Sequence, residues 1–409
     1  MSRYRWLSIA LITAAVISCG RLPCAFAVIN LGVVPTPRDV EPQDGSFTVD
    51  ASTPLVLSPQ ATEGERFAAE RLRDSLRELF NLPLAIQSDA ESAASAKSIV
   101  IGKPDAFPEV ASRMKKYGLT LSEKMRKEGY VLGVGNDGVV IGALSDAGVL
   151  YGTMTLRQMI QAREAAMPLP GVKIHDWPYL GMRGIQDEIS YGQVSTMENF
   201  KDIIRFLALY KMNTMFVYIE DMFQFKKYPT IGVGRGALSK EQVDELEAFA
   251  KPYNVQIIPI FEMLGNQGAL LMLDEVRPFA EYPGAHSFAT NDAAFEFLTN
   301  CFEELIEAFD SKYFHAGLDE SWDLGYGKTE EAVKRDGRGP VHAAHYRRLN
   351  ELLKGRGKTM IMYADIILTR PEILKLIPKD IILMDWQYDP AEHYPTLDTL
   401  AKYDFPLMV

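Results

Sequence analysis

Short apolar segments alternate with longer helical segments from Trp177 to the end of the chain, and this alternation is the strongest constraint on the fold. The apolar segments have the length and composition of buried strands. They are Met182–Asp187, Thr214–Ile219, Val255–Phe261, Tyr313–Gly317, Thr359–Tyr363, Ile381–Met384 and Phe405–Val409. The helical stretches between them include Met197–Tyr210, Lys240–Ala250, Asp292–Phe309 and Val341–Leu353. Strands that alternate with helices form a parallel sheet, so residues 176–409 are predicted to form an α/β fold, a (β/α)8 TIM-type barrel.

The predicted strands number seven, one fewer than such a barrel needs. The chain stops on the apolar run Phe405–Val409, and no closing helix follows it. We therefore expect the last strand to be missing from this chain and the barrel to be incomplete at its C-terminus.

Residues 28–165 are predicted to form a small α+β domain that precedes the barrel. Phe67–Phe80 places its apolar side chains on one stripe of a helix. Tyr130–Val134 and Val139–Ala143 are β-rich runs on either side of Asn136-Asp137-Gly138, which is a strong signal for a hairpin turn.

The same hairpin contains Gly133-x-Gly135-x-x-Gly138, which has the glycine spacing of a dinucleotide-binding loop. Such a loop needs a helix that begins at the last glycine, because the helix N-terminus binds the pyrophosphate. A strand follows here instead, so no nucleotide cofactor is expected.

The first residues, 1–27, are predicted to be a secretory signal and not part of the fold. Two arginines precede an apolar stretch that is short for a membrane span, and Ala25-Phe26-Ala27 matches a signal peptidase site. Alternatively, Val16-Ile17-Ser18-Cys19 resembles a lipobox, which would leave Cys19 as a lipid-anchored N-terminus. The protein is therefore expected to be exported, as a periplasmic or secreted protein without a membrane span or as a membrane-anchored lipoprotein.

Cleavage after Ala27 would leave Cys301 as the only cysteine, which excludes an intrachain disulfide in the mature protein. Cys301 lies on the apolar stripe of the predicted helix Asp292–Phe309. It is therefore expected to be a small buried residue and not a reactive thiol.

The charge of the chain argues against one class of partner. There are 43 lysines and arginines against 54 aspartates and glutamates, which gives a net charge of −11. Nucleic-acid binding requires clustered positive charge that displaces counterions from phosphates. Nucleic acid is therefore not expected as a partner.

Carboxylates gather at the C-terminal ends of the predicted strands, where the active site of such a barrel forms. They are Asp187, Glu188, Glu220, Asp221, Glu262, Asp319, Glu320, Asp365 and Asp385. A ring of this kind could ligate a hard cation or hold a sugar. Trp322, Tyr363 and Trp386 could stack on the apolar face of a pyranose. Because Arg183 could also donate hydrogen bonds to sugar hydroxyls, the sugar is the favoured ligand.

A metal site built on histidine is not expected. His342 and His345 lie three residues apart on the predicted helix Val341–Leu353, but they lack the spacing and the acidic partner of zinc peptidases. Both are predicted to be helix-surface residues.

The segment His315-Ala316-Gly317-Leu318-Asp319-Glu320 resembles the His-x-Gly-x-Asp-Glu signature of glycoside hydrolase family 20, the β-N-acetylhexosaminidases. Two other segments are similar to that family. Tyr179–Gly184 resembles its opening barrel strand, and Asp146–Gln158 resembles the end of the small α+β domain that precedes the barrel. The resemblance covers essentially everything after the predicted signal and implies the same two-domain fold.

The resemblance also implies an activity, the exo-acting and retaining removal of terminal GlcNAc or GalNAc from a glycan, with neither metal nor cofactor. In this family the 2-acetamido group of the substrate supplies the nucleophile. Asp319 would stabilise the oxazolinium-like intermediate, and Glu320 would be the general acid and base. The implied substrate-binding residues are Arg183, Asp221, Glu262, Asn266, Trp322, Tyr363, Asp365 and Trp386.

Two positions depart from the family pattern. Asn266 stands where the family's Pro-Glu-x-Asp-x-Pro-Gly-His segment ends in histidine, and Tyr363 stands where many members carry tryptophan. Two other functions therefore stay open: a non-catalytic carbohydrate-binding relative, and a β-glycosidase for sugars that lack the acetamido group.

Overall fold

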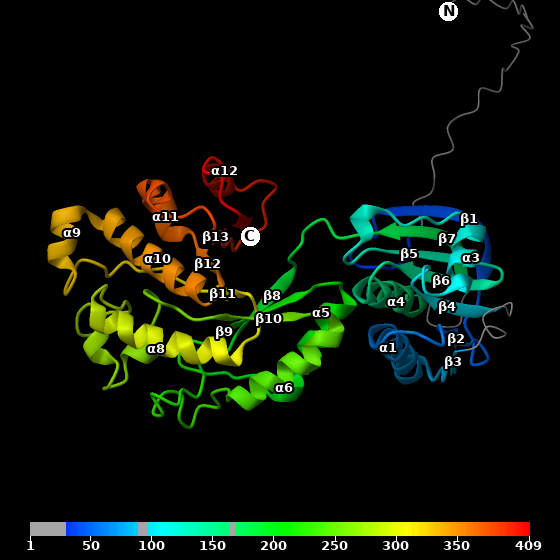
Figure 1. Cartoon of the computed structure of the whole chain (residues 1–409), viewed down its shortest axis with the longest axis horizontal. Coiled ribbons are helices and arrows are strands. Elements are labelled where there is room, and N and C mark those ends of the chain that lie inside the picture. The colour runs from blue at the N-terminus through cyan, green and yellow to red at the C-terminus, as the bar shows by residue number, and fades with distance from the viewer. Residues whose placement is uncertain (1–29, 89–96, 163–167) are drawn as a thin grey trace, which may run out of the picture.

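The computed structural model of the chain describes residues 30–88, 97–162 and 168–409. The predicted signal sequence, with Cys19, lies outside the described residues. The described chain forms two sheets, each with its own helices, and a segment after Asp176 leads from the first sheet to the second (Figure 1). No helix in these three stretches is long and apolar enough to cross a membrane.

The first sheet has seven strands in the order β1-β7-β5-β6-β4-β2-β3. They are β1 (Asp39–Phe47), β2 (Leu55–Val56), β3 (Ile86–Gln87), β4 (Ser98–Gly102), β5 (Tyr130–Gly135), β6 (Gly138–Ala143) and β7 (Leu169–Asp176). The predicted hairpin is confirmed as the antiparallel pair β5–β6, in which Gly135 is paired with Gly138. β7 pairs with β1 and β5, so this sheet continues past residue 165.

Three helices cover the two faces of the first sheet. They are α1 (Glu63–Phe80), α3 (Pro108–Tyr117) and α4 (Asp146–Gln161). Thr62 and Glu65 form a capping box at the start of α1, and Ser145 caps α4. Because side chains alternate along a strand, β5 buries Leu132 in the core beneath α1 and α4 and Val131 in the core beneath α3.

The second sheet is parallel throughout, in the order β14-β13-β12-β11-β10-β9-β8. Its strands are β8 (Gly184–Glu188), β9 (Thr214–Tyr218), β10 (Gln256–Ile260), β11 (Tyr313–His315), β12 (Thr359–Tyr363), β13 (Ile382–Met384) and β14 (Leu407–Met408). All seven predicted strands are therefore confirmed, each within about two residues at either end. β8 and β14 are the edges of a curled sheet, which is the expected incomplete barrel (Figure 1).

Some helices of the second part pack on the outer face of its sheet, and others lie in the segments that connect its strands. Together they are α5 (Met197–Leu209), α6 (Lys240–Ala250), α7 (Gly268–Leu271), α8 (Asp292–Ala308), α9 (Glu330–Asp336), α10 (Arg338–Gly355), α11 (Asp365–Thr369) and α12 (Pro395–Ala401). Cys301 is a free and fully buried thiol on α8, as predicted. The largest apolar core of the protein lies between these helices and the sheet.

The two parts of the protein contact each other through α4 and α5. Gln158 Nε2 donates a hydrogen bond of 2.8 Å to the carbonyl oxygen of Leu209. Phe67 packs edge-on against Tyr253, with ring centroids 4.8 Å apart. The first domain is therefore docked on the outside of the barrel, away from the C-terminal ends of its strands.

Candidate active site

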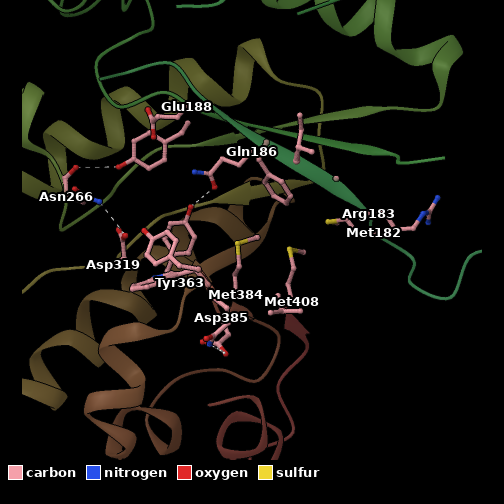
Figure 2. Close-up of a pocket in the computed structure, with 18 of the residues that line it drawn as sticks. Met182, Arg183, Gln186, Glu188, Asn266, Asp319, Tyr363, Met384, Asp385 and Met408 are labelled. Atoms are coloured by element: carbon pink, nitrogen blue, oxygen red, sulfur yellow. Dashed lines mark hydrogen bonds between the residues drawn. The ribbon is translucent and has the colours of Figure 1, made fainter. Parts of the chain in front are cut away.

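Loops that follow the strands of the second sheet line a pocket of about 810 Å³ (Figure 2). They come from the ends of neighbouring strands, which is where a parallel barrel collects its functional side chains. Eight residues of this wall were predicted from the sequence, namely Arg183, Glu188, Asn266, Asp319, Glu320, Tyr363, Asp385 and Trp386.

Asp319 is almost fully buried at the pocket wall, with 9% of its surface exposed. Its Oδ2 accepts a hydrogen bond from Asn266 Nδ2 at 3.4 Å. Burial, together with the nearby charges of Asp365 and Glu320, raises the pKa of Asp319 to about 7. The carboxyl group of Asp319 therefore changes its charge near neutral pH.

Glu262 is fully buried beside Asp319 and does not reach the pocket surface. Its Oε2 accepts a hydrogen bond of 2.7 Å from the backbone N–H of Leu318. Burial, and the charge of Asp319, hold the pKa of Glu262 well above its usual range, which favours its protonated form. A neutral Glu262 can donate its proton in the hydrogen bond that joins it to Asp319.

Glu320 follows Asp319 in the chain, but its side chain faces the open pocket. The backbone is left-handed at Leu318, with φ of 79°, and at Glu320, with φ of 48°. Each such residue costs roughly 1–3 kcal/mol unless its surroundings hold it in place. Here the N–H of Glu320 donates to Asp365 Oδ2 at 2.9 Å. This turn gives two adjacent carboxyl groups different surroundings, one buried and one open.

Two predicted aromatic residues stand on the pocket wall. Tyr363 is buried, and its hydroxyl donates a 2.8 Å hydrogen bond to Gln186 Oε1. Trp386 is 37% exposed, and its ring centroid lies 5.2 Å from that of Tyr388. Exposed ring surface beside the carboxylates is suited to stacking on a sugar.

Four predicted binding residues do not stand on the pocket wall. Glu262 and Asp365 lie behind it and support Asp319 and Glu320. Asp221 is buried and forms an ion pair with Arg235, while Trp322 is half exposed outside the pocket. Within residues 30–88, 97–162 and 168–409, no group of three or more histidine, cysteine or acidic residues is arranged to hold a metal ion.

Arg183 lines the same pocket as Asp319, but at its far end, and its guanidinium is bonded to other parts of the protein. β8 begins only at Gly184, so Arg183 lies at the opposite end of the strand from the carboxylates. Its Nε and Nη2 donate to the carbonyl oxygen of Lys211 at 2.9 and 2.8 Å, and its Nη1 forms an ion pair of 3.1 Å with Glu128. Its side chain points away from Asp319 (Figure 2), and it links the first domain to the barrel instead.

Tyr191 is a residue of the pocket wall that the sequence analysis missed. Its hydroxyl donates a hydrogen bond of 3.2 Å to Asn266 Oδ1, and its ring stacks on that of Tyr218. A signal was present in the sequence, because Tyr191 is an aromatic residue just after a strand end that carries carboxylates.

The prediction that His342 and His345 lie on a helix surface is wrong, because only 1% and 5% of their surfaces are exposed. His345 Nε2 donates to the carbonyl oxygen of Met263, in the loop after β10, at 2.8 Å. His342 Nδ1 donates to the carbonyl oxygen of Arg338. Because the neutral ring has only one N–H, its Nε2 accepts a hydrogen bond of 3.1 Å from the hydroxyl of Ser321, in the loop after β11. α10 therefore braces both loops that carry the site.

These histidines should make stability depend on pH. Burial lowers the pKa of His345 from 6.5 to about 4, so the unfolded chain binds a proton between these pH values and the folded chain does not. The free energy of unfolding should fall as pH drops through this window. His345→Gln keeps an N–H donor but does not titrate, so its stability relative to wild type should rise by up to about 3 kcal/mol from pH 7 to pH 4.

Urea unfolding at several pH values measures this difference. His286, which is exposed, provides a control for the substitution of a histidine by glutamine, as His286→Gln. A constant difference between His345→Gln and wild type across the window would show that His345 is not neutral in the folded protein.

Comparison with known proteins gives two family matches. Residues 30–177 match the model for glycosyl hydrolase family 20, domain 2, and residues 192–404 match that for the glycosyl hydrolase family 20 catalytic domain. A β-hexosaminidase of Porphyromonas gingivalis is 28% identical over 71% of this chain and 39% of its own length. A β-N-acetylhexosaminidase of Cellulomonas fimi is 24% identical over 74% of this chain and 62% of its own length. The chain thus spans less than two thirds of these relatives.

Solved structures show the same fold. A β-N-acetylhexosaminidase of Bacteroides fragilis superposes with a TM-score of 0.69 at 20% identity, over 93% of this chain and 74% of the other. An exo-β-N-acetylglucosaminidase of Vibrio harveyi, in complex with N-acetylglucosamine, superposes with a TM-score of 0.71 at 18% identity. That match covers 92% of this chain and 60% of the other.

Proposed function

Since the chain belongs to glycoside hydrolase family 20, we propose that it is a retaining exo-β-N-acetylhexosaminidase, which removes terminal GlcNAc or GalNAc from a glycan. The observation that carries this proposal is the adjacent pair of carboxyl groups, with Asp319 buried and Glu320 open to the pocket. The pocket volume, about 810 Å³, is in the range of small-ligand sites.

Adjacent carboxylates suit a reaction in which the substrate supplies the nucleophile. An ordinary retaining glycosidase places its two carboxylates on either side of the scissile bond, one as the acid and one as the nucleophile. Here the acetamido carbonyl oxygen would attack the anomeric carbon while the bond to the leaving oxygen breaks and Glu320 gives that oxygen its proton. Water would then open the cyclic intermediate and return a proton to Glu320, which restores the acetamido group.

Asp319 would bind the acetamido N–H and balance the positive charge that develops on the intermediate. It can do so only as a carboxylate, and its pKa lies near 7. Asn266 offers a hydrogen-bond donor to the ionised form, and so does the neighbouring Glu262 in its protonated form. The activity is therefore expected to fall as pH drops below about 7.

Aryl glycosides distinguish this function from the two alternatives. The protein should hydrolyse an aryl N-acetyl-β-glucosaminide and leave the matching aryl β-glucoside largely intact. If the protein prefers the glucoside, the acetamido group takes no part in the reaction and the protein is a different β-glycosidase. Binding of N-acetylglucosamine with no release of the aryl group would identify a carbohydrate-binding protein.

The geometry of Arg183 leads to a further expectation. Arg183→Met should lower the free energy of unfolding by about 2–3 kcal/mol, because Glu128 loses a charged partner and the carbonyl of Lys211 loses two donors. It should leave the KM for the aryl N-acetylglucosaminide unchanged. Arg335→Met, which removes an exposed ion pair with Asp336 on α9, is the control and should change stability by less than about 1 kcal/mol. If Arg183→Met instead raises KM strongly and leaves the free energy of unfolding unchanged, Arg183 binds the sugar.

A further inference from the structure

Asn266 lies between a tyrosine hydroxyl and the buried carboxylate of the site. Its Nδ2 donates to Asp319 Oδ2 at 3.4 Å, and its Oδ1 accepts from the hydroxyl of Tyr191 at 3.2 Å (Figure 2). An ionised carboxylate only accepts hydrogen bonds, so the amide must turn its NH2 group toward Asp319. The bond from Tyr191 favours the same orientation, because it places a donor opposite Oδ1.

The backbone around Asn266 is also held in place. Asn266 has a φ of 52°, in the left-handed region that asparagine tolerates better than most residues. The hydroxyl of Tyr218 lies 3.5 Å from its carbonyl oxygen, and the ring of Tyr191 stacks on Tyr218 at 6.4 Å with an angle of 24° between the planes. Residues from the ends of β8, β9 and β10 thus fix one amide against the end of β11.

We propose that Tyr191 is a positioning residue, which holds the Asn266 amide so that its NH2 group orients the carboxylate of Asp319 and stabilises the charged form. We call this pair, Tyr191 and Asn266, the amide clamp. The proposal rests on the function proposed above, in which Asp319 must be ionised and correctly turned toward the acetamido group. Tyr191 acts through Asn266 and not by contact with the reacting atoms.

The clamp is one of several groups that act on Asp319. Ionisable groups face Asp319 from its own loop and from the elements packed around it. They are Glu320, Asp365 at the start of α11, Glu262 after β10, Tyr191 after β8, Tyr218 of β9, Tyr346 of α10 and Tyr363 of β12. Asp365 and Glu320 raise the pKa of Asp319, whereas Glu262 and the Asn266 amide lower it by hydrogen bonding. Loss of the clamp should therefore move the titration of Asp319 to higher pH.

Tyr191→Phe removes only the hydroxyl and is the first test. We expect kcat for the aryl N-acetylglucosaminide to fall roughly 5- to 10-fold, with little change in KM, because one hydrogen bond of the clamp is lost. The acid limb of the pH profile should move to higher pH. Tyr326→Phe is the matched control, since Tyr326 is equally exposed, at 68%, and lies outside the pocket wall. An unchanged pH profile in Tyr191→Phe would overturn the proposal.

A double-mutant cycle tests whether Tyr191 acts through Asn266. Asn266→Ala should reduce kcat and shift the acid limb at least as much as Tyr191→Phe does. In the Asn266→Ala background the further change Tyr191→Phe should have no effect. If the reductions in kcat caused by the two substitutions multiply instead, Tyr191 acts on the substrate directly and the proposed amide clamp is wrong.

The titration of Asp319 separates failure of the clamp from failure of the proposed function. The ¹³C signal of the Asp319 carboxyl group, identified by its loss in Asp319→Asn, can be followed with pH in the absence of substrate. If the midpoint of the Asp319 titration lies at higher pH in Tyr191→Phe than in wild type, the amide clamp is supported even if the protein hydrolyses no N-acetylglucosaminide. Equal midpoints in an active enzyme would refute the clamp and leave the proposed function standing.

Discussion

Glu320→Gln is expected to slow the hydrolysis of substrates with poor leaving groups by about 10²–10⁴-fold. The amide has the size of the carboxyl group but cannot give a proton to the departing oxygen. A substrate whose leaving group is already stable as an anion needs no such proton in this step and should lose far less. Values of kcat/KM for an N-acetylglucosamine disaccharide and for a dinitrophenyl N-acetylglucosaminide would measure the contrast.

Two further variants show whether this difference between substrates with poor and with good leaving groups is specific to Glu320. Asp319→Asn should slow both substrates, because the intermediate loses its stabilising charge whatever the leaving group. Glu351→Gln changes an exposed carboxylate on α10 and should slow neither. If Glu320→Gln slows both substrates equally, Glu320 is not the proton donor.

Gly265→Ala is expected to damage both stability and activity. A Cβ at this position would lie 2.1 Å from the carbonyl oxygen of Asp319 and 2.7 Å from the backbone nitrogen of Ser321. These are backbone atoms, so the loop after β10 must move away from the loop after β11. Overpacking of this kind costs about 1–3 kcal/mol, and a displacement of about 1 Å at reacting groups can cost about 10²-fold in rate.

The measurements are urea unfolding and kcat for the aryl N-acetylglucosaminide. Gly355→Ala, at the end of α10, is the matched control because no atom lies within 4 Å of its added Cβ. It should be neutral or slightly stabilising, since alanine favours a helix over glycine by up to about 1 kcal/mol. Wild-type activity and stability in Gly265→Ala would mean that the two loops are not packed as closely as described.

The positions of the strands and of the carboxylates could be predicted from the sequence. Apolar runs of four to seven residues, separated by amphipathic helices, specify a parallel sheet. The side chain that follows each run must then lie at the C-terminal edge, which is why Asp319, Glu320 and Asn266 come together in one pocket. Each of these inferences needs only the order of residues along the chain.

The direction of a side chain could not be predicted in this way. Arg183 was placed inside a strand that begins one residue later, so its contacts with Lys211 and Glu128 were invisible. The buried face of α10 combines apolar residues with His342 and His345, and the apolar periodicity does not show that the two histidines are buried as well. The left-handed turn that separates the surroundings of Asp319 and Glu320 depends on packing between distant segments.

The two histidines of α10 have a consequence for the lifetime of the catalytic geometry. His345 is bonded to the loop after β10 and His342 to the loop after β11, so one rigid helix carries both loops. Relative motion of the strands can bend the sheet without separating these loops from each other. We therefore expect undocking of α10 to separate Asn266 from Asp319, so the stability of this one helix helps to set the lifetime of the catalytic geometry.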